Sequence, residues 1–214
     1  MANTEYGAVK LTTLTGIANA IRLKDGSSGT IKPVDMAAKI TNIPTGGITS
    51  RLNGTLTEVD DTDLTTLCEY GLAYCPVTSV NIPNVTEIQI YGFFHCESLT
   101  SLVLPNVTTL GTNAFSNCYV LNTVELTKRV SITNGCFTSC RSLENLILRD
   151  SAGVYNLTPS ALNSSTPFAA NGSGGTVYVP SSLKSSYESN NTWAAIIALN
   201  ANNKIEAIEG SIYE

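Results

Sequence analysis

Four cysteines recur at nearly constant intervals through the middle of this 214-residue chain. They are Cys75, Cys96, Cys118 and Cys140, separated by 21, 22 and 22 residues. A period of this length indicates one small structural unit repeated along the chain. Equivalent residues of stacked units lie above one another, so the spacing predicts a solenoid with about 22 residues per coil.

Other columns of the sequence agree with the cysteine alignment. A large apolar residue stands three positions before each cysteine, and these residues are Leu72, Phe93, Phe115 and Phe137. Each unit ends in an alternation of apolar residues, such as Leu102 and Leu104, that is typical of a short strand with one buried side. An ordinary β-sandwich does not explain a Phe-x-x-Cys pattern repeated every 22 residues. We therefore predict an α+β fold built on a solenoid of short parallel strands.

The cysteines themselves leave two possibilities open. Neighbouring coils are close enough for disulfides between equivalent cysteines. A cysteine repeated once per coil also packs well as a small apolar side chain, and we expect free thiols. Cys68 and Cys136 lack the C-x-x-C spacing of a zinc site, and no metal site is predicted.

The repeat consensus V-T-x-L-x-x-x-A-F-x-x-C-x-x-L-x-x-L-x-L-P-N is well represented by VTTLGTNAFSNCYVLNTVEL, residues 107–126. It resembles the BspA-type, or Treponema-type, leucine-rich repeat, and the resemblance covers residues 64–148. It implies that the strands line the inner face and that the A-F-x-x-C segments form the outer turns. It also implies a surface adhesin or another binding protein.

The two ends of the chain depart from the repeat. Residues 11–24 and 33–40 each carry an apolar helical face, which predicts a small N-terminal helical hairpin. Residues 176–180, TVYVP, followed by a serine-capped helix, predict a C-terminal strand-helix cap. The expected organisation is a docking module at 1–45, a linker and first turn at 46–63, the solenoid at 64–150, and a degenerate repeat with the cap at 151–214.

The N-terminal segment LTGIANAIRLKDGSSGTIKPVDMAAKI also resembles a short module of prophage tail and tail-fibre proteins. The matching residues are Ile17, Ala18, Ala20, Ile21, Arg22, Lys24, Gly26, Ile31, Pro33, Met36, Ala37 and Ile40. The resemblance implies docking onto other virion tail proteins. Tail fibres are usually homotrimers, although this chain has no heptad run to drive trimerisation.

Residues that carry chemistry are scarce. The one histidine, His95, adjoins Cys96, but neighbours on an extended segment point to opposite sides. Asp60, Asp61 and Asp63 are candidates for a Ca²⁺ site, although a solvated turn that caps the first coil explains them better. With no phosphate-binding motif either, we predict no cofactor and no enzymatic activity.

The totals restrict the partners. A net charge of −5 without a basic patch argues against nucleic acid. No run of 18 apolar residues exists, so no membrane insertion is expected.

What remains is surface. The residues between the buried positions of each strand are expected to project as two rows on the inner face, where they would bind a host protein or glycan unless they are only solvent-facing filler. These candidate ligand-binding residues are Ser79, Asn81, Ser101, Val103, Thr123, Glu125, Asn145 and Ile147.

Two functional hypotheses follow. The first is a non-enzymatic phage or prophage virion protein, made in the host cytoplasm, that acts in the tail as a fibre or receptor-binding component. The alternative is a bacterial cell-surface adhesin or protein-interaction module of the BspA-like type. It predicts an export signal, and the N-terminal sequence MANTEYGAVK does not resemble one.

Overall fold

The computed structural model describes residues 56–162 and 165–214. The chain divides into two compact units, Met1–Leu56 and Thr57–Glu214. The predicted helical hairpin, and with it the docking module at 1–45, lies outside the described residues.

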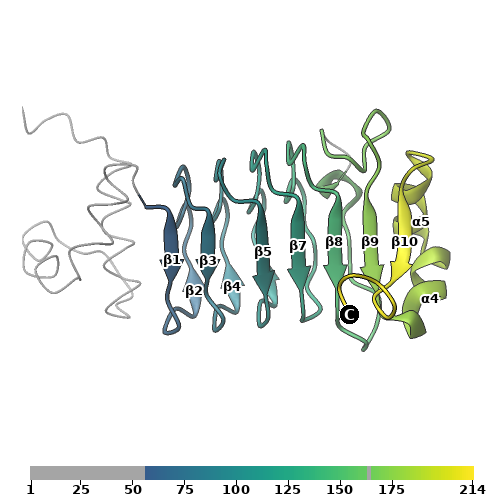
Figure 1. The fold of residues 1–214 in the computed structure, drawn as a ribbon, viewed down its shortest axis with the longest axis horizontal. Helices are drawn as coiled ribbons and strands as arrows, with labels where there is room; N and C mark the ends of the chain where they lie inside the picture. The colour runs from purple at the N-terminus through teal and green to yellow at the C-terminus, as the bar shows by residue number, and fades with distance from the viewer. Residues whose placement is uncertain (1–55, 163–164) are drawn as a thin grey trace, which may run out of the picture. The chain divides into compact units, whose positions relative to one another are not determined.

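The second unit is a succession of short strands, with two short helices between its last two strands (Figure 1). Its strands and α-helices are β1 (Glu58–Asp60), β2 (Thr66–Leu67), β3 (Ser79–Asn81), β4 (Glu87–Ile88), β5 (Ser101–Leu104), β6 (Thr109–Leu110), β7 (Thr123–Leu126), β8 (Asn145–Leu148), β9 (Thr176–Val179), α4 (Lys184–Ser189), α5 (Asn191–Ala198) and β10 (Lys204–Ala207). Single 3₁₀ turns occupy Pro159–Ala161 and Ser181–Leu183.

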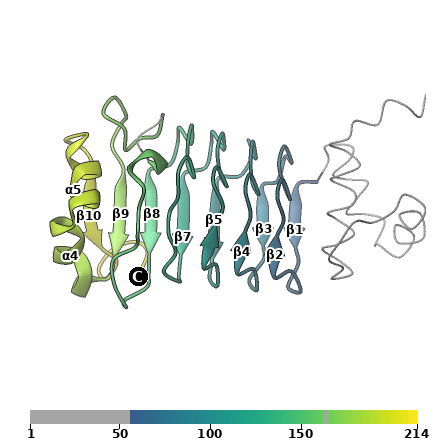
Figure 2. The ribbon, with the colours of Figure 1, turned by 180° about the vertical axis from the view of Figure 1, so that it is seen from behind.

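The strands form two layers, and every pairing is parallel. One layer contains the pair β1-β3 and the five-stranded sheet β10-β9-β8-β7-β5, and the other contains β2-β4-β6. Figure 2 shows β2 and β4 from behind. Leu102 pairs with Val124 and Val124 with Leu146, so paired residues are 22 positions apart. These repeated parallel strands confirm the solenoid character of the fold.

Stacked aromatic rings form the centre of the core. The rings of Phe93 and Phe115 have centroids 5.2 Å apart, and those of Phe115 and Phe137 are 5.3 Å apart, with interplanar angles of 13° and 10°. All three side chains are fully buried. One coil is too thin to bury such a ring alone, so each ring needs the coils on either side.

The repeated cysteines join the same coils through weak hydrogen bonds. The Cys118 thiol donates to the carbonyl oxygen of Phe93, and the Cys140 thiol to that of Phe115, each at 3.0 Å. Burial raises the pKa of Cys140, which keeps this thiol protonated and able to donate. None of the six cysteines forms a disulfide in this structure, and free thiols remain a prediction.

The C-terminal cap closes the end of the core. The Asn190 side chain accepts hydrogen bonds from the Thr192 and Trp193 amides and thereby starts α5. The buried indole of Trp193 donates to the carbonyl oxygen of Tyr155 at 2.8 Å and packs edge-on against Tyr187.

Among the described residues, no helix combines the length and apolarity needed to cross a bilayer.

A carboxylate fixes the turn after β8. Asp150 accepts hydrogen bonds from the amides of Ala152, at 2.7 Å, and Arg129, at 3.0 Å, so it joins two coils. The bond from Ala152, assisted by that from Arg129, lowers the pKa of Asp150 below its ordinary value, against the opposing effect of partial burial.

Adjacent phenylalanines provide a test of the stacked core. Replacing the buried Phe93 with Ala is expected to lower the unfolding free energy by roughly 3–5 kcal/mol, because it opens a cavity within the file of rings. The same change at the half-buried Phe94 is expected to cost about 1 kcal/mol. Urea denaturation measures both values, and equal losses would contradict a core built on Phe93.

Acid stability tests the role of Asp150. Its folded-state pKa lies below that of the unfolded chain, so its contribution is present above about pH 4 and is lost as pH falls through the folded value. Wild type and Asp150→Asn should therefore differ most in unfolding free energy near neutral pH and converge toward pH 2.5. A difference that stays constant across this range would exclude the carboxylate as its source.

Candidate functional site

The eight candidate ligand-binding residues lie at alternate positions of β3, β5, β7 and β8. Ser101, Thr123 and Asn145 are paired in one row, and Val103, Glu125 and Ile147 in a second. We call this side of the front layer the strand face. Its exposure changes along the solenoid: Ser79, Asn81, Ser101 and Val103 are exposed, Thr123, Glu125 and Asn145 are half-buried, and Ile147 is buried.

Ile147 departs from the expectation that all eight side chains project into solvent. Only 1% of it is exposed, against 54% of Val103 in the same row. The C-terminal loop, residues 208–214, turns back past the ends of β9 and β8 in Figure 1. The Tyr213 ring packs on that of Tyr178 in β9, with centroids 4.7 Å apart. The chain's own C-terminus therefore lies over this half of the strand face.

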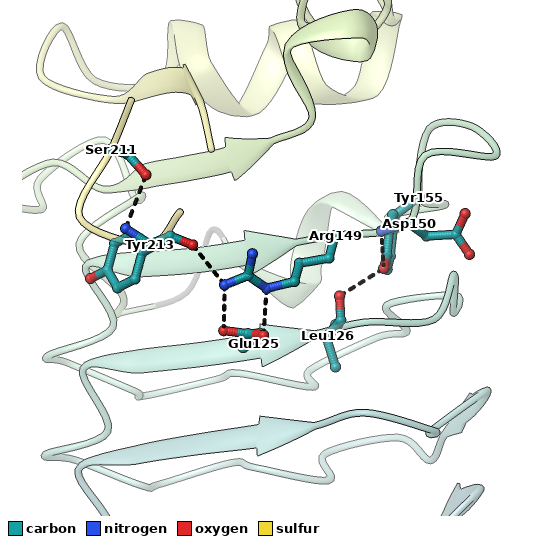
Figure 3. Close-up of polar contacts among 7 residues, drawn as sticks. All are labelled: Glu125, Leu126, Arg149, Asp150, Tyr155, Ser211 and Tyr213. Atoms are coloured by element: carbon teal, nitrogen blue, oxygen red, sulfur yellow. Dashed lines mark hydrogen bonds and ion pairs between the residues drawn. The ribbon is translucent and has the colours of Figure 1, made fainter. Parts of the chain in front are cut away.

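An arginine anchors this loop (Figure 3). The Arg149 guanidinium donates to the carbonyl oxygen of Tyr213 at 2.7 Å and to both carboxylate oxygens of Glu125, at 2.5 and 3.3 Å. The hydrogen bond with Glu125 raises the pKa of Arg149 further. Because the two charges neutralise each other under the loop, Glu125 is engaged within the molecule.

The uncovered half of the strand face contains a groove of about 270 Å³ between β3 and β5. These neighbouring strands belong to separate sheets and are not paired. β3 begins four residues after Cys75, whereas β5 begins five residues after Cys96, so one coil is a residue shorter at this point. The groove brings together four of the predicted residues, Ser79, Asn81, Ser101 and Val103, with Pro83 and Pro105 beside them.

The groove is suited to recognition. Its side chains are hydroxyls, one amide and apolar groups, and none of the lining residues is titratable. Asn81 donates to a carboxylate oxygen of Asp60 at 2.8 Å, which orients the amide. A general acid or base is therefore missing from the lining, while hydrogen-bond donors and acceptors surround an exposed valine.

The other candidates from the sequence have structural partners. His95 lies 2.9 Å from Glu97 and 2.9 Å from the Asn117 amide, while the Cys96 thiol donates to the buried carbonyl of Leu72. Asp61 accepts the Asp63 and Leu64 amides, both at 3.1 Å, as expected for a residue that caps a turn. Within the described ranges, no group of three or more His, Cys, Asp or Glu side chains is arranged to hold a metal ion.

Sequence reasoning missed a row of aromatic side chains on the outer turns. Tyr70 stacks on Tyr91 at 4.9 Å, Tyr74 stacks on His95 at 5.0 Å, and Phe94 packs edge-on against Tyr74, Tyr91 and His95. We call these five residues the aromatic ladder. They occupy positions one, two and five before the cysteine, so a comparison of those columns would have found them.

Four ladder residues adopt the left-handed backbone conformation. Their φ angles are 54° (Tyr70), 60° (Tyr74), 58° (Tyr91) and 56° (His95). Later coils fill the same positions with Asn113, Asn117, Gly135 and Ser139, at φ of 56°, 63°, 65° and 61°. Asn and Gly tolerate this conformation, whereas a bulky residue loses about 1–3 kcal/mol. Ring stacking, at about 0.5–1.5 kcal/mol per pair, offsets part of that loss.

Comparison with known families agrees with this geometry. Residues 65–169 match the family model described as BspA type leucine rich repeat region, in 6 copies. This part of the chain is similar to BspA-type leucine-rich repeats. The match covers just under half of the chain and indicates no catalytic family. Among curated proteins, none matches the sequence.

Two solved structures resemble the chain at low identity. One is a leucine-rich repeat protein from Eubacterium ventriosum, with 19% identity and a TM-score of 0.47 over 57% of this chain and 35% of that one. The other is a leucine rich cell surface protein from Faecalibacterium prausnitzii, with 20% identity and a TM-score of 0.37 over 77% and 62%. The chain thus spans less than two thirds of either protein.

The anchor of the C-terminal loop can be tested with two ion pairs of the same unit. Replacing Arg149 with Met removes its bonds to Glu125 and Tyr213, and we expect a loss of roughly 1–2 kcal/mol of unfolding free energy. Hydrogen exchange in residues 208–214 should accelerate. The matched control is Lys184→Met, whose ammonium lies 3.3 Å from Glu206 on a more exposed surface, and we expect a loss below about 1 kcal/mol. Similar losses in both variants, with no faster exchange at the C-terminus, would argue against the anchor.

Proposed function

We propose that this chain is a protein-interaction module of the bacterial cell surface, of the adhesin type, which binds its partner through the uncovered half of the strand face. The groove between β3 and β5 is the observation that carries the proposal. It presents polar groups and an exposed valine without titratable side chains, a composition that favours binding over catalysis. The similarity to BspA-type repeats supports the same conclusion, because leucine-rich-repeat domains generally bind proteins.

The chemistry of the groove describes its partner. Val103, more than half exposed, would be the apolar anchor, and Ser79, Asn81 and Ser101 would satisfy the polar groups of a protein backbone or side chain around it. A stable interface buries about 800 Å² on each partner, so neighbouring strands must contribute. In this proposal Thr123, Glu125 and Asn145 form the rim of the interface, and Ile147 takes part only if the C-terminal loop moves.

The virion hypothesis has less support. Tail-protein partners, a homotrimer and location in a phage tail depend on the resemblance of residues 14–40 to prophage modules, and these residues lie outside the described ranges. The family match concerns the repeats alone. We therefore place the cell-surface module first. We retain the proposed organisation of a docking module at 1–45, a linker at 46–63, the solenoid at 64–150 and the cap at 151–214, without enzymatic activity.

The groove can be tested by adding one charge at matched positions. The full chain would be assayed against an array of purified extracellular proteins and, in parallel, an array of glycans. Val103→Glu should weaken binding to the recognised protein at least tenfold, because it buries an unpaired charge in the interface. Thr109→Glu, at an exposed position of β6 in the other layer, should leave binding unchanged.

Two results would contradict the proposal. One is recognition of glycans with no protein ligand on the array. The other is an equal loss of binding in the Val103→Glu and Thr109→Glu variants at equal thermal stability, which would show that the strand face has no special part in binding.

A further inference from the structure

The aromatic ladder is not explained by the requirements of the turn it occupies. Asn113 and Asn117 adopt the same backbone conformation in the next coil with smaller, polar side chains. Tyr74 is nevertheless 66% exposed, and Tyr70 is also exposed. Clustered aromatic rings on a solvent-facing surface are typical of interaction sites, where they provide contact area with little loss of side-chain freedom.

The segment that carries the ladder is acidic. Residues 57–127 contain eight carboxylates and neither Lys nor Arg, whereas residues 128–214 contain six acidic and six basic residues. The eight are Glu58, Asp60, Asp61, Asp63, Glu69, Glu87, Glu97 and Glu125. Glu97 is exposed and lies next to the ladder, 2.9 Å from His95. A surface of this sign attracts cationic partners and repels anionic ones.

The molecule itself shows how a cation fits this surface. The Arg141 guanidinium lies over the Tyr119 ring, 5.1 Å from its centroid, and Tyr119 in turn packs edge-on against His95. Tyr119 and Arg141 occupy the position directly after the cysteine in successive coils, and one coil earlier the same position holds Glu97. The rings of the aromatic ladder lie in residues 57–127. This segment contains no arginine that could cover them in the same way.

We propose that the aromatic ladder docks an arginine-bearing segment of a partner protein. Its guanidinium groups stack on Tyr74, Tyr91 and Phe94, as Arg141 does on Tyr119, and pair with Glu97. Arginine suits the site better than lysine because the guanidinium is planar and weakly hydrated. This surface goes beyond the proposed function and is separate from it, since Val103 and the groove belong to the strand face.

The test uses the full chain and a fluorescent peptide of alternating Arg and Gly, with a Lys-Gly peptide and chitohexaose for comparison. Anisotropy measures peptide binding at low and high salt, and calorimetry measures the sugar. The decisive variant is Tyr74→Asn with Tyr91→Asn, which installs at these two positions of the repeat the residue found in the coil after the ladder, as Asn117 and Asn113. The control is Val103→Asn, on the strand face.

We expect saturable binding of the arginine peptide that weakens with salt and exceeds that of the lysine peptide. The double variant should bind about tenfold more weakly at a melting temperature no lower than that of wild type, while Val103→Asn binds as wild type does. Loss of adhesion in Val103→Glu with peptide binding retained would separate the two surfaces.

Three results would overturn the proposal. They are no saturable binding at low salt, equal binding by wild type and the double variant, or binding of chitohexaose in place of the arginine peptide. If the double variant unfolds, Glu97→Gln decides the question: it should weaken binding about threefold, whereas Glu188→Gln, on α4, should not. Equal effects of these two variants would show that the peptide responds only to the net charge of the protein, and this would overturn the proposed site.

Discussion

The stacking of one coil on the next is the constraint on which the rest of the structure depends. Phe115 lies between Phe93 and Phe137. The thiols of Cys96, Cys118 and Cys140 each donate to a carbonyl of the coil before. A coil of this length has no interior of its own, so apolar burial comes almost entirely from its neighbours. Stability is therefore distributed along the solenoid, and side chains off the stacking axis are free to serve other purposes.

The same constraint makes the ends and the interruptions important. The last coil of the repeat has no further coil to pack against. The C-terminal cap, which consists of β9, β10, α4 and α5, takes that place. The C-terminal loop then continues back across the strand face and is held there by Arg149. At the other end of this face, the pairing stops between β3 and β5, where one coil is a residue shorter. A regular face is thereby divided into a covered half and an open half with a groove.

The outer turns show a different consequence of repetition. Each of the four cysteine-bearing coils adopts the left-handed conformation at two positions, where most residues are strained. Later coils use Asn, Gly and Ser there, while the earlier coils use Tyr and His. Because the backbone requirement is the same in all of them, it does not by itself account for the aromatic residues. Comparing the residues at one position in successive coils thus distinguishes side chains that the turn requires from side chains that are candidates for binding.

The sequence by itself determined the features that repeat once per coil. Columns such as Phe93, Phe115 and Phe137 identified the core, and the spacing implied parallel strands. The alternation within each strand placed Ser101 and Val103 on the side that faces away from the core. The tertiary structure alone decided which outward positions stay open. Arg149 and Tyr213 are 64 residues apart, and neither belongs to a repeating column, so no pattern predicted that their contact would accompany the burial of Ile147. Likewise, the shorter coil at Cys75 was visible in the sequence, but whether β3 and β5 would pair depended on how two coils settle against each other.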